Sequence, residues 1–144
     1  MSERSVAQKL LIRDGQRVAL VDPPAAGAAL LGTLPSGVTI EASASAGADV
    51  VILFVRDRAA LEAWWPTVAA AVRPSTVLWL GYPKRGHGVA TDLTRDHGWA
   101  PVHASGYDPV TQVAIDDTWS ALRWRRDPAL RAARVARGAR VGQD

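Results

Sequence analysis

The 144-residue sequence contains no cysteine, and this absence excludes disulfides, cysteine-ligated zinc, iron–sulfur clusters and thiol nucleophiles. It also lacks any run of 18 apolar residues, which excludes a membrane-spanning helix. Glu3, Arg4 and Lys9 precede the first apolar stretch, and this pattern does not match a signal peptide. We therefore expect a cytoplasmic protein.

Two catalytic motifs are missing as well. The phosphate-binding spacing GxxxxGK[ST] and the serine-hydrolase spacing GxSxG do not occur. His87, His97 and His103 do not have the spacing of metal ligands. We expect neither a bound metal nor serine-hydrolase chemistry.

What is present is an ordinary globular composition, with 48% hydrophobic and 22% charged residues. The net charge is +3, from fifteen arginines, two lysines and fourteen acids. The positive charge is concentrated at the end of the chain, because residues 1–122 sum to −2 and residues 123–144 sum to +5. This indicates one domain over residues 1–126, followed by a basic helix or tail over 127–144.

Apolar stretches separated by turn-forming residues predict the secondary structure. The predicted helices cover residues 6–12, 25–31, 58–72 and 129–137, and two short helical pieces are expected within 91–103. The predicted strands cover residues 17–21, 38–41, 48–55, 76–82, 110–115 and 118–125. The strand at 48–55 is apolar without alternation, which is typical of a parallel strand covered on both faces.

Individual residues refine the predicted helices. Asp57 is placed to cap the helix at 58–72, and Asp22 is placed to cap the helix at 25–31. Pro66 interrupts the helical pattern, so we expect a kink or a break there. One side of that helix carries apolar residues at core spacing, namely Leu61, Trp64, Trp65, Val68 and Val72.

Strands alternating with helices predict an α/β fold with a reduced Rossmann-like, mostly parallel sheet and a C-terminal antiparallel hairpin at its edge. Residues 48–82 resemble the middle of a class I S-adenosylmethionine methyltransferase: an apolar strand, a helix, then AAAVRPSTVLWL. GQRVALV resembles the strand that leads into the glycine-rich loop of that family, and the closing hairpin also fits.

The chain to about Arg126 is similar to a family of small bacterial proteins filed as a domain of unknown function. The segments that carry this resemblance are FVRDRAALEAWWPTVAAAVRP, YPKRGHGVATDLT and DDTWSALRWRR. The resemblance implies a reduced methyltransferase-like Rossmann core and brings no established activity.

The residues at the ends of the first two predicted strands give a weak indication of cofactor binding. The methyltransferase pattern requires glycines after the first strand, and this chain has VDPPAAG there. Two prolines remove two backbone donors, and Asp22 adds negative charge, so we expect no dinucleotide at this turn. S-adenosylmethionine has no phosphate and stays possible, with Asp22 and Glu41 as candidate cofactor-binding residues. The plainer interpretation of Glu41 is an exposed carboxylate at a strand end.

A basic loop follows the strand at 76–82, where ligands of open α/β sheets bind. We interpret it as an anion-accepting loop because it combines cations, flexible glycines and a following polar residue. Its candidate ligand-binding residues are Lys84, Arg85, Gly86, His87, Gly88 and Thr91. The alternative is a solvated turn whose charges point outward.

Further polar residues near this loop are possible supports for a ligand. Asp92 is placed to hold Lys84 or Arg85, or else to cap a helical turn. Adjacent carboxylates in a hairpin can anchor a metal or act as acid and base, but they more often stabilise the turn. The supporting candidates are Asp92, Asp116, Asp117, Thr118 and Trp119.

The arginines over residues 123–140 suit nucleic-acid phosphates or an acidic protein surface, although no nucleic-acid-binding motif accompanies them. We carry three functions forward. The first is a non-catalytic binding or regulatory domain for a small anionic ligand or a protein partner, the second a methyltransferase-like enzyme, and the third a nucleic-acid-associated protein. The oligomeric state is open, and a homodimer is compatible with the sequence.

Overall fold

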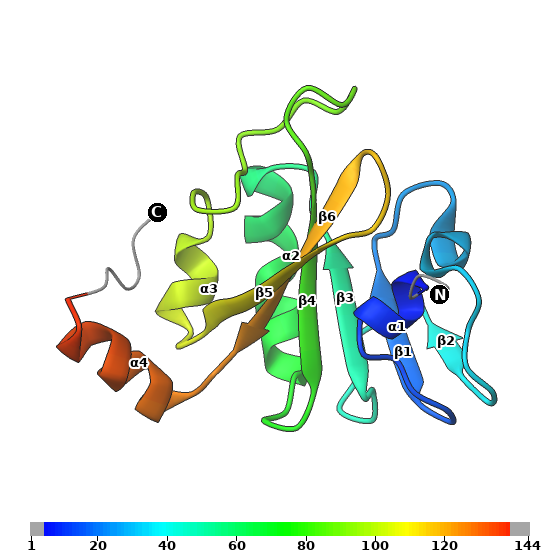
Figure 1. The fold of residues 1–144 in the computed structure, drawn as a ribbon, viewed down its shortest axis with the longest axis horizontal. Helices are drawn as coiled ribbons and strands as arrows, with labels where there is room; N and C mark the ends of the chain where they lie inside the picture. Colours follow the sequence, from blue (N-terminus) through cyan, green and yellow to red (C-terminus); the bar gives the residue numbers. More distant parts are fainter. Residues whose placement is uncertain (1–4, 139–144) are drawn as a thin grey trace, which may run out of the picture.

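A computed structural model describes residues 5–138 as one six-stranded sheet with helices on both faces (Figure 1). The spatial order of the strands is β2-β1-β3-β4-β6-β5. Neighbouring strands pair in parallel from β2 to β4, and β6 runs antiparallel to both β4 and β5. The strands are β1 (Arg17–Val21), β2 (Thr39–Glu41), β3 (Val50–Phe54), β4 (Val77–Pro83), β5 (Asp108–Ala114) and β6 (Trp119–Arg125). The predicted fold class, a reduced Rossmann-like sheet with an antiparallel hairpin at its edge, is confirmed.

Strand β3 lies at the centre of the core. All residues from Val50 to Val55 are at most 1% exposed, as the unbroken apolar run predicts for a parallel strand covered on both faces. Alternate side chains enter two separate cores. Val51 and Leu53 contribute to the core under α2 (Arg58–Ala71), and Ile52 and Phe54 contribute to the core under α1 (Val6–Lys9).

Helix α2 begins where the sequence predicts, because the Asp57 side chain accepts a hydrogen bond from the Ala60 N–H at 2.9 Å. Its buried residues are Leu61, Trp65 and Val68. Of the kink or break expected at Pro66, the break is wrong, since the helix continues through this residue to Ala71. Proline has no N–H, so the carbonyl of Glu62 loses its hydrogen-bond partner within the helix. Pro66 and Glu62 are exposed, so water can bond to that carbonyl instead.

The opposite face is covered by much shorter elements. Helix α1 and the 3-10 helix η1 (Gly27–Leu31) pack there through Ala7, Leu10 and Leu31. A buried hydrogen bond fixes α1 to the sheet, because the Trp79 indole N–H donates to the Leu10 carbonyl at 2.9 Å. Within residues 5–138, none of the helices combines the length and the hydrophobicity needed to cross a bilayer.

The C-terminal helix α4 (Pro128–Ala136) has no buried residue and is attached through polar contacts. Arg131 makes two hydrogen bonds to the buried carboxylate of Asp108, from Nε to Oδ2 at 2.9 Å and from Nη2 to Oδ1 at 3.2 Å. The same guanidinium donates to the carbonyls of His103 and Tyr107. The Nδ1 of His103, a residue of α3 (Ala100–Ala104), lies 3.3 Å from the Asp108 Oδ1. Arg131 is therefore the main attachment of α4 to the sheet.

We expect Arg131→Ala to lower the free energy of unfolding by about 2–3 kcal/mol, because the buried Asp108 carboxylate loses its paired cation. This expected loss is smaller than is usual for breaking a buried ion pair, because the Arg131 side chain is 29% exposed. Urea denaturation measures this change. Arg137→Ala, at the C-cap of the same helix, is the control and should shift stability by less than about 0.5 kcal/mol. Equal effects of the two substitutions would contradict the anchoring role.

The buried Tyr82 and the partly buried Tyr107 predict a loss of stability at alkaline pH. Tyr82 packs its ring edge against Trp99, and Tyr107 packs against Trp65. Burial raises the pKa of both phenols above their ordinary value of 10.0. The unfolded chain therefore loses these protons first, so their stabilising contribution is complete below about pH 10 and declines as the pH rises above it.

Urea midpoints measured from about pH 8 to about pH 11 test this expectation. The Tyr82→Phe, Tyr107→Phe double variant should lose less stability over that range than the parent protein. An identical decline in both proteins would show that other groups cause the alkaline loss.

Candidate functional site

The carboxyl ends of β1 and β2 form one crevice, at the position where open α/β sheets bind ligands. Its volume is about 390 Å³, and its walls are largely apolar. Asp22 and Glu41, the two candidate cofactor-binding residues, both line it, together with Trp64 from α2. We call this space the Asp22–Glu41 crevice. The remaining lining residues are Leu20, Pro23, Gly27, Ala28, Ile40 and Ala42.

The turn after β1 explains why this crevice differs from a dinucleotide site. Asp22 has a left-handed backbone with φ of 50°, a conformation that glycine adopts most readily and that aspartate tolerates. The segment that follows is the five-residue 3-10 helix η1, which starts at Gly27. The short helix predicted at 25–31 is thus present as a 3-10 helix over 27–31, but the predicted Asp22 cap is wrong, because Ala26 occupies the cap position and makes no side-chain cap. The two prolines delay the helix and shorten it.

Glu41 is oriented by two neighbours. The Arg17 Nε donates to the Glu41 Oε1 at 2.6 Å, and the Ser45 hydroxyl donates to the Oε2 at 3.3 Å. Glu41 is partly buried, so it is not the freely solvated carboxylate of the plainer interpretation. A carboxylate has about four lone-pair positions, which leaves acceptor capacity for a hydroxyl of a bound ligand.

The amino end of α2 faces the same edge of the sheet and is already occupied by carboxylates. Asp57 caps the Ala60 N–H, and the Asp92 Oδ1 accepts a hydrogen bond from the Arg58 N–H at 2.8 Å. Asp92 is thus engaged at the start of α2, which agrees with the capping alternative rather than with a contact to Lys84 or Arg85. Negative charge at this position complements the helix dipole and disfavours a second anion.

The predicted anion-accepting loop lies farther along the same edge, beyond β4. Lys84 connects it to the β5–β6 hairpin: its Nζ donates to the Asp116 carbonyl at 2.7 Å, and its backbone N–H donates to the Thr118 carbonyl at 2.7 Å. Four residues of the loop are exposed, namely Arg85, Gly86, His87 and Gly88. The Thr91 hydroxyl accepts a hydrogen bond from the Leu93 N–H at 3.1 Å. Lys84 therefore positions the loop, and Arg85 is its exposed cation.

The hairpin tip has the geometry of a stabilised turn. The Asp116 carboxylate accepts hydrogen bonds from the N–H groups of Thr118 and Trp119, at 2.8 and 2.7 Å. Asp117 is exposed. The Trp119 ring packs edge-on against Phe54 at a centroid distance of 5.4 Å. Asp116 and Trp119 thus have structural roles at the tip, and within residues 5–138 there is no cluster of three or more His, Asp or Glu residues that could hold a metal.

The arginines of the C-terminal helix do not form an outward row. Arg131 binds Asp108, and the Arg134 Nη1 donates to the Pro109 carbonyl at 3.2 Å. Arg137 is exposed, while Arg140 lies outside the described residues. Two of the cations expected to contact nucleic acid are therefore used to attach α4.

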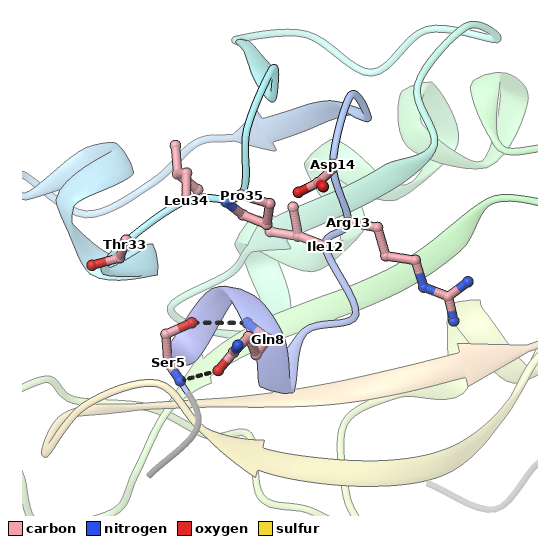
Figure 2. A pocket seen from close by; sticks show the side chains of 8 residues that line it. All are labelled: Ser5, Gln8, Ile12, Arg13, Asp14, Thr33, Leu34 and Pro35. Carbon is pink, nitrogen blue, oxygen red and sulfur yellow. Dashed lines mark hydrogen bonds between the residues drawn. The ribbon is translucent and has the colours of Figure 1, made fainter. Parts of the chain in front are cut away.

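A wider groove of about 720 Å³ lies between α1 and the segment after η1 (Figure 2). Several of its polar side chains already make hydrogen bonds: Ser5 and Gln8 form a capping box, with hydrogen bonds of 2.8 and 3.2 Å. The Asp14 carboxylate accepts the Ser36 N–H at 3.2 Å. Figure 2 shows the Arg13 guanidinium extending away from the groove. No reactive combination of side chains gathers there, and none of the predicted site residues lines it.

Comparison with known proteins gives distant structural likenesses. No protein-family model matches the chain, and no curated protein matches it either. Among solved structures, it is similar to DhpI in complex with SAH, at 15% identity over 85% of this chain and 83% of that one, with a TM-score of 0.48. It is also similar to the M1A22 tRNA methyltransferase TrmK of B. subtilis, at 11% identity over 87% of this chain and 67% of that one, with a TM-score of 0.43. At this distance neither likeness carries an argument about function.

The fold and the crevice together define the chain as a reduced Rossmann-like α/β domain. Sequence reasoning found the two acids of the crevice and missed its aromatic wall. Trp64 was assigned to the core from its helical spacing, but it is only partly buried and lines the crevice. Its neighbour Trp65 is the fully packed one, at 4% exposure. Adjacent side chains on a helix point about 100° apart, so only one of the two tryptophans can point straight into the core, and this was the available signal.

We expect Lys84→Met to lower the free energy of unfolding by about 1 kcal/mol, because it removes a hydrogen bond between loop and hairpin. Arg85→Met changes the same charge at the next residue and should leave stability unchanged within about 0.5 kcal/mol. Urea denaturation of the two variants provides the comparison. A larger loss for Arg85→Met than for Lys84→Met would reverse the assignment of the two roles.

Proposed function

We propose that this chain is a small-molecule-binding domain whose ligand is a nucleoside-type compound of neutral or positive charge. The observation that carries the proposal is the convergence of Asp22, Glu41 and Trp64 on one crevice at the carboxyl ends of β1 and β2. Trp64 offers an aromatic surface for a flat base, and the two carboxylates can accept hydrogen bonds from ribose hydroxyls.

The negative charge around the crevice favours some nucleoside-type ligands over others. The crevice is bordered by Asp22 and Glu41, and the nearby start of α2 is occupied by Asp57 and Asp92. Helix η1 has five residues and offers no anion site. A diphosphate would therefore meet carboxylates where a dinucleotide fold presents free N–H groups. S-adenosylmethionine carries a sulfonium cation and no phosphate, and it is the ligand class we favour.

The proposal is for binding rather than turnover. The lining of the crevice contains no histidine, lysine, serine or threonine, so its side chains include no general base other than the two carboxylates. Methyl transfer is the second candidate function, because it would use the same crevice with an acceptor placed beside the sulfonium.

A steric test uses two adjacent alanines of η1. Ala28 lines the crevice and Ala29 does not, and both are exposed. We expect calorimetric titration to detect S-adenosylmethionine or its demethylated product binding to the parent protein and to Ala29→Trp. Ala28→Trp should weaken that binding by at least about tenfold, because the indole occupies the crevice.

Folding of both variants is checked by urea denaturation, where similar midpoints show that the indole acts locally. No binding to the parent protein, or equal weakening by the two tryptophans, would overturn the crevice assignment. A binding-competent protein that also releases the demethylated product in the presence of a methyl acceptor would establish the second candidate function instead.

A further inference from the structure

A second concave site lies at the amino edge of the sheet, at the opposite end from the Asp22–Glu41 crevice. It is a cleft of about 300 Å³ between the turn at 72–76, which precedes β4, and the junction of β6 with α4. Figure 1 shows this turn at the lower edge of the sheet. We call the space the arginine cleft, because four arginines line it, namely Arg73, Arg123, Arg125 and Arg126.

The charge of the arginine cleft is poorly balanced by the protein. Asp127 is the one acid among the described residues that line it. Its carboxylate caps the Leu130 N–H at 3.1 Å and lies 3.6 Å from the Arg125 guanidinium. Burial lowers the pKa of Arg123, and the charge of Arg125 lowers it further. The like charges thus oppose one another, and an anion between them would relieve that repulsion.

The wall of the cleft also contains donors that lack an acceptor. The Nε of Arg123 and the Nε1 of Trp124 are buried and have no hydrogen-bond partner among the described residues. Both groups can only donate. Arg123 also borders a smaller cleft with Lys9 and Trp79, and the Trp124 ring also packs against Trp99 and His103 in the core under α2. The protein therefore provides no hydrogen-bond acceptor for these two donors among the described residues.

Size and shape point to a small ligand rather than to a polymer. A volume of about 300 Å³ is at the lower end for ligand pockets. Tyr107 and the Ser75 hydroxyl also line the cleft, which gives a partly aromatic surface beside the cations. The arginines of α4 do not extend the basic surface into a track for a strand, because Arg131 and Arg134 turn toward β5.

We propose that the arginine cleft binds a phosphomonoester of a small metabolite, with guanidinium groups holding the phosphate. Planar guanidinium groups bind phosphate oxygens in pairs, which suits clustered arginines better than clustered lysines would. The site is independent of the proposed nucleoside crevice, since it uses different residues at the other edge of the sheet. Either site can fail its test without affecting the other.

The test uses ribose 5-phosphate as the probe and ribose as its uncharged control, so that no nucleobase can engage the Asp22–Glu41 crevice. Calorimetric titration should show saturable one-to-one binding of ribose 5-phosphate, tighter than about 1 mM, and no binding of ribose. Ala28→Trp should leave this binding unchanged. Inorganic phosphate should compete with the probe.

Matched double variants separate the cleft from general charge. Arg73→Gln with Arg126→Gln removes two cations from the cleft, and we expect binding at least about tenfold weaker. Arg13→Gln with Arg137→Gln removes two exposed cations elsewhere and should bind like the parent protein. Equal weakening in both pairs, or no saturable binding to the parent protein, would overturn the proposal.

A measurement on the parent protein covers the case in which the cleft variant does not fold. The indole N–H resonance of Trp124, assigned with Trp124→Phe, should shift when ribose 5-phosphate is added, while ribose leaves it in place. An unmoved resonance at saturating probe would refute the location. Binding of a single-stranded oligonucleotide without any binding of ribose 5-phosphate would replace the small ligand with nucleic acid.

Discussion

The burial of β3 on both faces is the constraint on which the rest of the structure depends. An unbroken apolar strand at the centre of a sheet is stable only when each face is covered. This chain has one long helix, α2, for one face, and it covers the other with the short elements α1 and η1. The Trp79–Leu10 hydrogen bond holds α1 in place where a longer helix would be held by its packing.

The charged side chains that could bind ligands lie at the two edges of the sheet. At the carboxyl edge, acids gather at β1, β2 and the start of α2, while the basic loop lies beyond β4. At the amino edge, arginines gather where β6 meets α4. The net charge of the chain therefore says little about either site, since an acidic crevice and a basic cleft occur in the same small domain.

The elements of the core could be predicted from the sequence because their signals are local. The apolar run of β3, the Asp57 cap and the turn residues around the final hairpin each identify an element without knowledge of its neighbours. The errors arose where distant residues decide. Asp92 was predicted to hold Lys84 or Arg85 of the preceding loop, but its carboxylate accepts a hydrogen bond from the Arg58 N–H, 34 residues away. The helix predicted at 25–31 starts only at Gly27 and is a 3-10 helix, because the two prolines before it supply no backbone N–H.

Side chains, rather than backbone groups, make the charged surfaces at both edges. The turn after β1 lacks the glycines and the helix that would expose free N–H groups, and carboxylates already occupy two N–H groups at the start of α2. A site built from backbone donors survives most substitutions, since every residue but proline supplies an N–H. A site built from arginines and aspartates depends on those side chains, so its charge changes with each one that is substituted. Specificity in this fold is therefore easy to change without remodelling the sheet.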